Sequence, residues 1–126
     1  MPVKTFLRIT TVLTAIIGAV LIILPVSISK FFLSDYVPGS EIFIRFLGSA
    51  LVGYSYLNWY TAKYKQLELM HATLIGNFST LMIALLISVI GMLDHSLKAT
   101  GWLIVLLHFT IGFGFGYYLY RSSNNT

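Results

Sequence analysis

Four uninterrupted apolar stretches constrain this chain more than any other feature. They occupy residues 6–28, 42–60, 69–93 and 101–120 of the 126 residues. Each is close to the roughly 20 residues with which an α-helix crosses a hydrocarbon core about 30 Å thick. Membrane-spanning β-strands would alternate apolar and polar residues, whereas residues 81–87 are all apolar. The sequence therefore predicts an all-α integral membrane protein, a four-helix antiparallel transmembrane bundle that forms one domain over residues 1–126.

The composition agrees with a membrane protein and argues against a soluble bundle. Charged residues make up 10% of the chain, compared with about 25% in soluble domains. The net charge is +4, but the basic residues are spread along the chain rather than gathered in one patch. This spread favours contact with the lipid bilayer and its anionic headgroups over binding of nucleic acid.

The positions of lysine and arginine predict the orientation, because cytoplasmic loops carry an excess of both residues. The N-terminus, the loop after the second stretch and the C-terminus together hold Lys4, Arg8, Lys63, Lys65 and Arg121, whereas the opposite side holds Lys30, Arg45 and Lys98. The first stretch is also too long for the apolar region of a signal peptide, which has about 7 to 15 residues. We therefore expect it to remain as a helix, with both termini in the cytoplasm.

Small and polar residues recur at spacings of three and four within each stretch, which places them on one face of each helix. Membrane helices associate through small residues and interhelical hydrogen bonds. We therefore expect one shared interior, with helix packing at Gly18, Gly53, Gly112 and Gly116. The candidate polar or ligand-binding residues in this interior are Arg45, Ser49, Tyr56, Asn77, Thr80 and His108.

Two of these candidates are ionisable, and each has a structural and a functional interpretation. Arg45 can reach the headgroups or pair with Glu41 one turn earlier, or it can bind an anion or gate a path. His108 can form a neutral hydrogen bond with Ser49 or Thr80, or it can relay protons or contact a ligand.

Asn77 needs a hydrogen-bond partner, because an unpaired amide in hydrocarbon costs several kcal/mol. Tyr56 and Thr11 lie within reach in an antiparallel arrangement, so we expect Asn77 to join two helices. Asn58 points roughly opposite to Arg45 on the second helix, and it joins the polar column only if that helix bends.

Groups that support catalysis are missing from the sequence. It contains no cysteine, no HExxH or GxSxG motif and no pair of carboxylates within an apolar stretch. His71 and His95 lie at opposite ends of the third helix and its following loop, so they cannot share a metal. We expect no enzyme activity, no catalytic residue, no metal and no cofactor; a lipid-modifying reaction with His108 as a base is a third and more distant interpretation.

One resemblance covers most of the chain. A first helix ending at Pro25, an amphipathic segment over residues 28–36, and Ile-Arg-Phe-Leu-Gly at residues 44–48 resemble small bacterial four-helix membrane proteins classified as domains of unknown function, loosely similar to the DoxX-like group. The resemblance implies a bacterial inner-membrane protein with a four-helix fold. It transfers no activity and no site residues.

These observations lead to two functional expectations. The first is a non-enzymatic accessory or interaction subunit, which works with other membrane subunits or with copies of itself. The alternative is a small transporter or channel for an anion or a neutral solute, with Arg45 at its mouth. The absence of acids from the apolar stretches argues against proton or cation coupling through a carboxylate.

Overall fold

The computed structural model describes residues 1–64 and 66–123, and these residues are almost entirely helical. Helix accounts for 85% of the chain, and the described part contains no strand. The elements are α1 (Val3–Ile23), α2 (Pro25–Phe32), α3 (Glu41–Lys63), α4 (Leu67–Leu93), the short 3-10 helix η1 (Ala99–Gly101) and α5 (Trp102–Ser123). The prediction of an all-α protein is therefore confirmed.

Three helical segments in the described residues are long and apolar enough to cross a membrane. They are Val3–Ile23, Leu67–Leu93 and Ala99–Ser122, with mean hydropathies of 2.3, 2.1 and 1.6. α3 has 23 residues, which is a sufficient length, but it carries Arg45 and several polar side chains. An integral membrane protein is thus supported by three helices, and α3 is long enough but less apolar.

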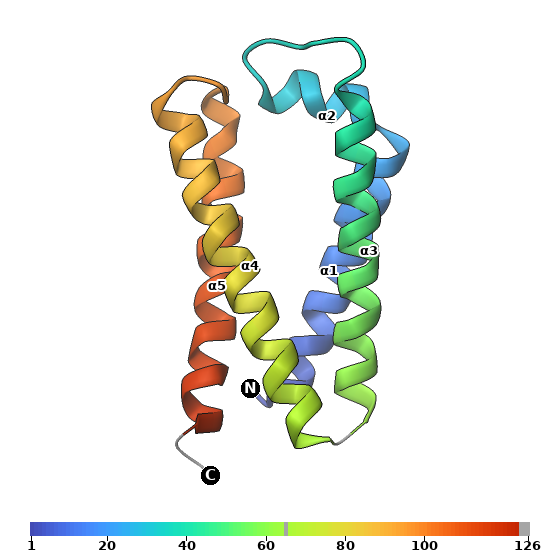
Figure 1. The fold of residues 1–126 in the computed structure, drawn as a ribbon, viewed down its shortest axis with the longest axis vertical. Coiled ribbons are helices and arrows are strands. Elements are labelled where there is room, and N and C mark those ends of the chain that lie inside the picture. The colour runs from blue at the N-terminus through green and yellow to red at the C-terminus, as the bar shows by residue number, and fades with distance from the viewer. Residues whose placement is uncertain (65, 124–126) are drawn as a thin grey trace.

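The first predicted helix, residues 6–28, is two helices in the structure. α1 ends at Ile23 and α2 begins at Pro25, with Leu24 between them at φ −120° and ψ 43°. Proline lacks an N–H group and disfavours helical geometry in the residue before it, yet it fits the first position of a new helix. Pro25 therefore breaks the apolar stretch, and α2 lies across one end of the molecule (Figure 1).

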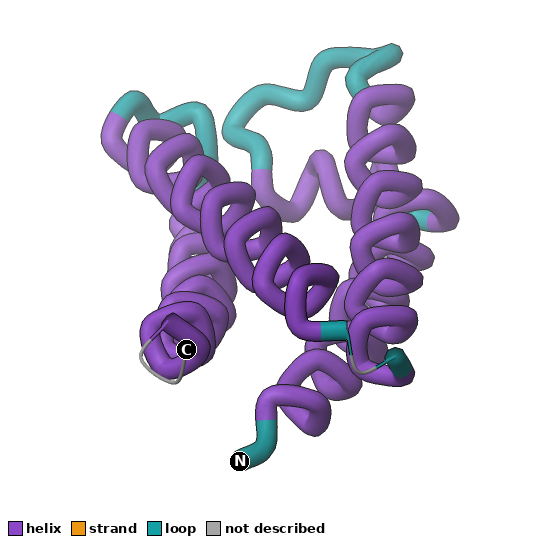
Figure 2. Tube along the Cα trace, turned by 60° about the horizontal axis from the view of Figure 1, so that its bottom comes forward, coloured by secondary structure: helices purple, strands orange, loops and turns teal. Residues whose placement is uncertain are grey.

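The four long helices form two pairs rather than one evenly packed bundle. α1 packs along α3, and α4 packs along α5. Figures 1 and 2 show that α4 leans across to reach α3 near the end where α1 begins and α5 ends, called here the terminal end. Along the α4 side of α3, Asn58 is fully buried, whereas Leu47, three turns further from the terminal end, is 55% exposed. The pairs therefore diverge towards α2.

Backbone contacts close the molecule again at the α2 end. The N–H of Ser34 donates to the carbonyl of Ser96 at 2.9 Å, and the N–H of Lys98 donates to the carbonyl of Phe32 at 2.8 Å. These bonds flank an isolated antiparallel bridge between Leu33 and Leu97. We call this group of contacts the α2 clasp. It ties the loop after α2 to the loop between α4 and α5.

The predicted packing glycines of α1 and α3 differ in their surroundings. Gly18 packs against Gly48 of α3, and this contact brings the two backbones together. A methyl group added at Gly53 would meet no atom within 4 Å. Gly18 therefore packs against another helix of the chain, with Gly48 as its partner, whereas Gly53 contacts no other helix of the described chain.

The two predicted packing glycines of α5 both face α4. A methyl group at Gly112 would lie 2.5 Å from the Met82 side chain, and one at Gly116 would lie 2.9 Å from the Phe78 ring. Glycines four residues apart permit this close approach of two membrane helices. The structure therefore places both predicted residues where α5 approaches α4.

Candidate functional site: the polar junction between the helix pairs

Four polar side chains hold the two helix pairs together near the terminal end. The Asn77 amide donates to Asn58 Oδ1 at 2.9 Å, and also to the Thr73 carbonyl at 2.9 Å. The hydroxyls of Thr61 and Thr73 form a hydrogen bond of 2.8 Å. All four side chains are buried. We call Asn58, Thr61, Thr73 and Asn77 the polar junction, because they join α3 to α4.

Helix geometry explains why these four residues meet. Asn58 and Thr61 are three residues apart on α3, and Thr73 and Asn77 are four apart on α4, so each pair shares one face of its helix. A hydrogen bond between membrane helices is worth about 0.6 kcal/mol on average and up to about 2 kcal/mol. Two such bonds, both buried, favour one fixed pairing of α3 with α4.

One amide in the polar junction is incompletely satisfied. Asn58 Nδ2 is buried and has no hydrogen-bond acceptor among the described residues. An unsatisfied buried donor costs about 1–3 kcal/mol, and such groups are uncommon in native structures. Asn58 is therefore the residue of the junction best suited to bind an additional acceptor.

An apolar cluster surrounds the polar junction. It consists of Leu7, Ala62, Leu74, Phe115 and Tyr118, which come from all four long helices and are at most 8% exposed. The ring of Phe115 also meets Phe6 of α1 edge-on, with 4.9 Å between ring centroids. The junction and this cluster together form the buried core where the two pairs meet.

Comparisons with known proteins assign the chain to no family. No protein-family model matches the chain, and neither a curated protein nor a solved structure matches it. The function is therefore argued from the geometry of the chain itself.

Two predicted site residues, Asn77 and Thr80, lie on the α3 side of α4. Asn77 binds Asn58 rather than the expected Tyr56 or Thr11. The Thr80 hydroxyl forms a hydrogen bond of 3.0 Å with the hydroxyl of Tyr54, one turn from Asn58. The expectation that Asn77 joins two helices is thus confirmed, with a different partner.

Three other predicted site residues lie on the outside of α3. Arg45, Ser49 and Tyr56 are exposed, and Tyr56 is 64% exposed. The Ser49 hydroxyl donates to the carbonyl of Phe46 within its own helix at 2.8 Å. The expectation that these three side chains share an interior with Asn77 is therefore wrong. Their stripe on α3 faces away from α4.

The carboxylate of Glu41 forms no salt bridge with Arg45, a pairing that the sequence leaves open as one alternative. Glu41 Oε2 accepts a hydrogen bond from the N–H of Gly39 at 2.8 Å and another from the Tyr36 hydroxyl at 3.2 Å. This carboxylate therefore orders the loop before α3. Arg45 is left on the outer face of its helix.

His108 lies within the α4–α5 pair and is half-buried. Its Nδ1 atom is 3.1 Å from the hydroxyl of Ser88 on α4, so the expected partners Ser49 and Thr80 are both incorrect. The Ser88 hydroxyl also lies 2.7 Å from the carbonyl of Ala84. This geometry makes His108 a helix-pairing residue. It is not part of the polar junction.

The sequence contains a signal for the junction in a second set of polar residues on α3. Tyr54, Asn58 and Thr61 form a second polar stripe on α3, on the side opposite to Arg45 and Ser49. With the stripe that contains Arg45 taken as the interior face, the buried and exposed sides of α3 are exchanged.

No cluster of three or more metal-ligating side chains occurs in residues 1–64 and 66–123.

Proposed function

We propose that this chain is a non-enzymatic, membrane-embedded interaction protein that pairs with another membrane helix through the outer face of α3. This face consists of Arg45, Ser49, Gly53, Tyr56 and Tyr60, which recur at three- and four-residue spacing and are all exposed. The observation that carries the proposal is that the stripe of α3 that contains Arg45 and Ser49 points away from the rest of the chain. The partner is another membrane subunit or a second copy of the chain.

The chemistry of this face supports a helix partner better than lipid. Ser49 and Gly53 give a small-xxx-small pattern, which lets two helix backbones approach closely, and no neighbouring atom occupies the space beside Gly53. Arg45 lies one turn inside α3, where an unpaired cation is costly in hydrocarbon. Tyr56 and Tyr60, with 6.4 Å between their ring centroids, extend the face with apolar area.

The proposal places α3 as a fourth membrane span beside α1. Both termini then lie on the cytoplasmic side, because Lys4, Arg8, Lys63 and Arg121 lie towards the terminal end. A bacterial inner membrane is the setting that the resemblance noted in the sequence implies. Within it, the α4–α5 pair and the polar junction fix the orientation of α3.

Cross-linking from single cysteines tests this interface, since the chain has no cysteine of its own. Ser49→Cys places a thiol on the outer face of α3, and Ile83→Cys places one on α4, where the native side chain is 60% exposed. We expect a photoreactive cross-linker that is attached to the single cysteine, and that captures any neighbouring protein on irradiation of native membranes, to give one discrete adduct with Ser49→Cys and none with Ile83→Cys. Equal adducts from both variants, or none from either, would refute the proposed interface.

A second function is favoured by a separate observation, the unsatisfied amide of Asn58. A chain that passes a small anion or a neutral solute between the helix pairs would use Asn58, Tyr54 and Thr80, rather than the predicted Arg45 mouth. Flux of chloride and of glycerol into proteoliposomes tests this alternative. It requires measurable flux that falls in Asn58→Leu and is unchanged in Ser49→Cys.

A further inference from the structure

A pocket opens at the terminal end, where three helices meet. Its volume is about 360 Å³, within the range of roughly 300–1,000 Å³ that is common for ligand sites. The beginnings of α1 and α4 and the last turn of α5 line it. The residues that matter for its chemistry are Val3, Leu67, Met70, Leu74, Arg121 and Ser122, and we call it the terminal pocket.

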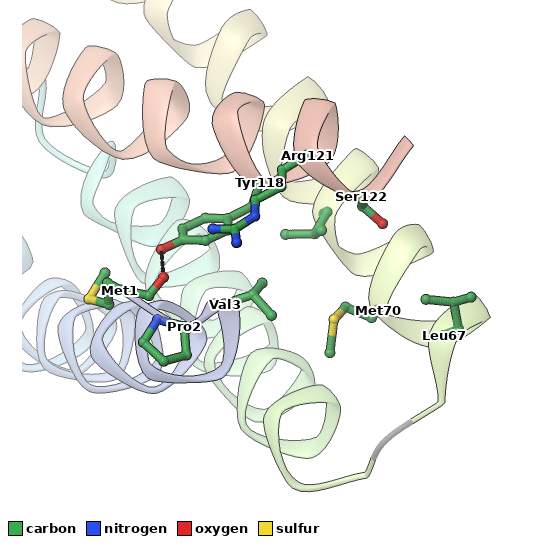
Figure 3. A pocket seen from close by; sticks show the side chains of 9 residues that line it. Met1, Pro2, Val3, Leu67, Met70, Tyr118, Arg121 and Ser122 are labelled. Atoms are coloured by element: carbon green, nitrogen blue, oxygen red, sulfur yellow. Dashed lines mark hydrogen bonds between the residues drawn. The ribbon is translucent and has the colours of Figure 1, made fainter. Parts of the chain in front are cut away.

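The wall of the terminal pocket is apolar and its rim is cationic. Figure 3 shows Val3 and Met70 on the side of the pocket that α1 and α4 form, with Arg121 and Tyr118 on the side that α5 forms. The Tyr118 hydroxyl donates to the Met1 carbonyl at 2.6 Å and so fixes the start of the chain against α5. A ligand held here would meet hydrocarbon on one side and a guanidinium on the other.

Two helix ends add positive potential to the same place. α1 begins at Val3 and α4 at Leu67, and neither helix has a side-chain cap on its first N–H groups. The first turn of α1 has no acidic residue, whereas Glu68 in the first turn of α4 offsets part of the positive potential there, so α1 makes the larger contribution. The N-terminus of a helix carries a partial positive charge and attracts anions. None of the described residues that line the pocket is acidic. The pocket therefore favours an anion that also carries an apolar portion.

The aromatic residues near the pocket place it at the depth of lipid headgroups. Tyr117 and Tyr120 are exposed on the last turns of α5, and Tyr60 and Tyr64 are exposed at the end of α3. Tyrosine is enriched at the boundary between a membrane and water, and basic pockets between membrane helices bind anionic headgroups.

We propose that the terminal pocket binds an anionic phospholipid. Arg121 and Ser122 donate hydrogen bonds to the phosphate oxygens. Leu67, Met70 and Leu74 contact the glycerol backbone and the first part of an acyl chain. This inference depends on the helices crossing a membrane but not on the outer face of α3, so cross-linking at Ser49 and lipid binding at Arg121 can fail separately.

The test measures lipid binding to the full chain in detergent. Native mass spectrometry gives the affinity for phosphatidylglycerol and for phosphatidylcholine with the same acyl chains, and thermal unfolding with each lipid gives a second readout. The variants are Arg121→Gln and, as a control with the same change of charge, Arg8→Gln. Arg8 is exposed on α1 and does not line the pocket. Met70→Trp fills the pocket and leaves Arg121 in place.

We expect phosphatidylglycerol to bind more tightly than phosphatidylcholine and to raise the unfolding temperature more. Loss of one charge-assisted contact in Arg121→Gln should weaken the binding of phosphatidylglycerol about tenfold. Met70→Trp should weaken the binding of both lipids, and Arg8→Gln should bind each lipid as the wild type does. Circular dichroism confirms that each variant is folded before lipid is added.

Three results would overturn the proposal. Equal losses in Arg121→Gln and Arg8→Gln would mean that the lipid responds only to overall charge. Unchanged binding in Met70→Trp would mean that the lipid does not occupy the terminal pocket. The same rise in unfolding temperature with inorganic phosphate or glycerol 3-phosphate would mean that the pocket selects a free phosphate and not a lipid.

Discussion

Gly18 and Gly48 bring α1 and α3 so close that a methyl group on either glycine would lie 2.7 Å from the carbonyl oxygen of the other. The contact is reciprocal, and both partners are backbone atoms, which cannot rotate away as a flexible side chain can. The pairing of α1 with α3 therefore depends on the absence of a side chain at both positions.

Gly48→Ala should destabilise the protein by about 1–3 kcal/mol, the usual cost of an overpacked contact. The added methyl group would also lie 2.9 Å from the Ile22 side chain. Gly76→Ala, within α4 and outside the proposed outer face of α3, is the control. Its methyl group has open space, so we expect no loss and a gain of up to about 1 kcal/mol from helix propensity. The free energy of unfolding in mixed micelles measures both, and equal effects would contradict the close approach.

Asn77→Leu should lower the free energy of unfolding by about 1–3 kcal/mol, because it leaves Asn58 buried without its partner. Asn58→Leu should cost less, because Asn77 keeps its bond to the Thr73 carbonyl and an unsatisfied donor is removed with Asn58. The double variant should cost less than the sum of the single variants, because the two residues form one network. A double-mutant cycle measures the coupling. An additive result would show that the two amides do not interact.

The sequence predicts the helices better than their faces. Long apolar stretches fix helix type and approximate length, because a backbone in hydrocarbon must satisfy its own hydrogen bonds. The apolar stretch alone predicts one helix over residues 6–28, whereas Pro25, at which the resemblance ends the first helix, marks the break between α1 and α2. The helix bounds predicted from the sequence therefore agree better with the structure for α4 and α5 than for α1.

The candidate site was only partly predictable, because α3 carries polar residues on two opposite faces. Arg45 and Ser49 lie on one face and Asn58 lies on the other. Which face points inward depends on where α1 and α4 pack, and those contacts are made by Gly48 and by Asn58 itself. A single helix gives no information about its neighbours, so the choice between the stripes needed the tertiary structure.

The turn after α4 should respond to acid through Asp94. Asp94 Oδ1 accepts hydrogen bonds from the Ser96 hydroxyl at 2.6 Å and from the Ser96 N–H at 2.9 Å, and these bonds lower the pKa of Asp94 below its ordinary value of 3.8. A lowered pKa in the folded state means that the carboxylate stabilises the turn at pH values above 3.8. This contribution is lost as the pH falls through the lowered pKa.

The measurement for Asp94 is a titration of the Ser96 amide by nuclear magnetic resonance. Its midpoint should lie below 3.8, and the transition should disappear in Asp94→Ala. A midpoint at or above 3.8 would show that Ser96 does not hold the carboxylate in its charged form.

The α2 clasp can be locked by a disulfide between Leu33→Cys and Leu97→Cys. These two residues form an antiparallel bridge whose flanking hydrogen bonds are Ser34 to Ser96 and Lys98 to Phe32. In that pattern the opposed Cα atoms lie about 4.5 Å apart, within the range that a disulfide spans. The double variant should therefore oxidise readily in air, seen as loss of two free thiols and faster migration on a non-reducing gel. Leu33→Cys with Leu93→Cys is the control, since Leu93 is exposed at the end of α4. If the control pair oxidised as fast as Leu33 with Leu97, the clasp would not hold the two loops in register. A triple variant that also carries Ser49→Cys shows whether the locked protein still binds its partner. If it still cross-links under non-reducing conditions, the outer face of α3 pairs with its partner without separation of the two helix pairs at the α2 end.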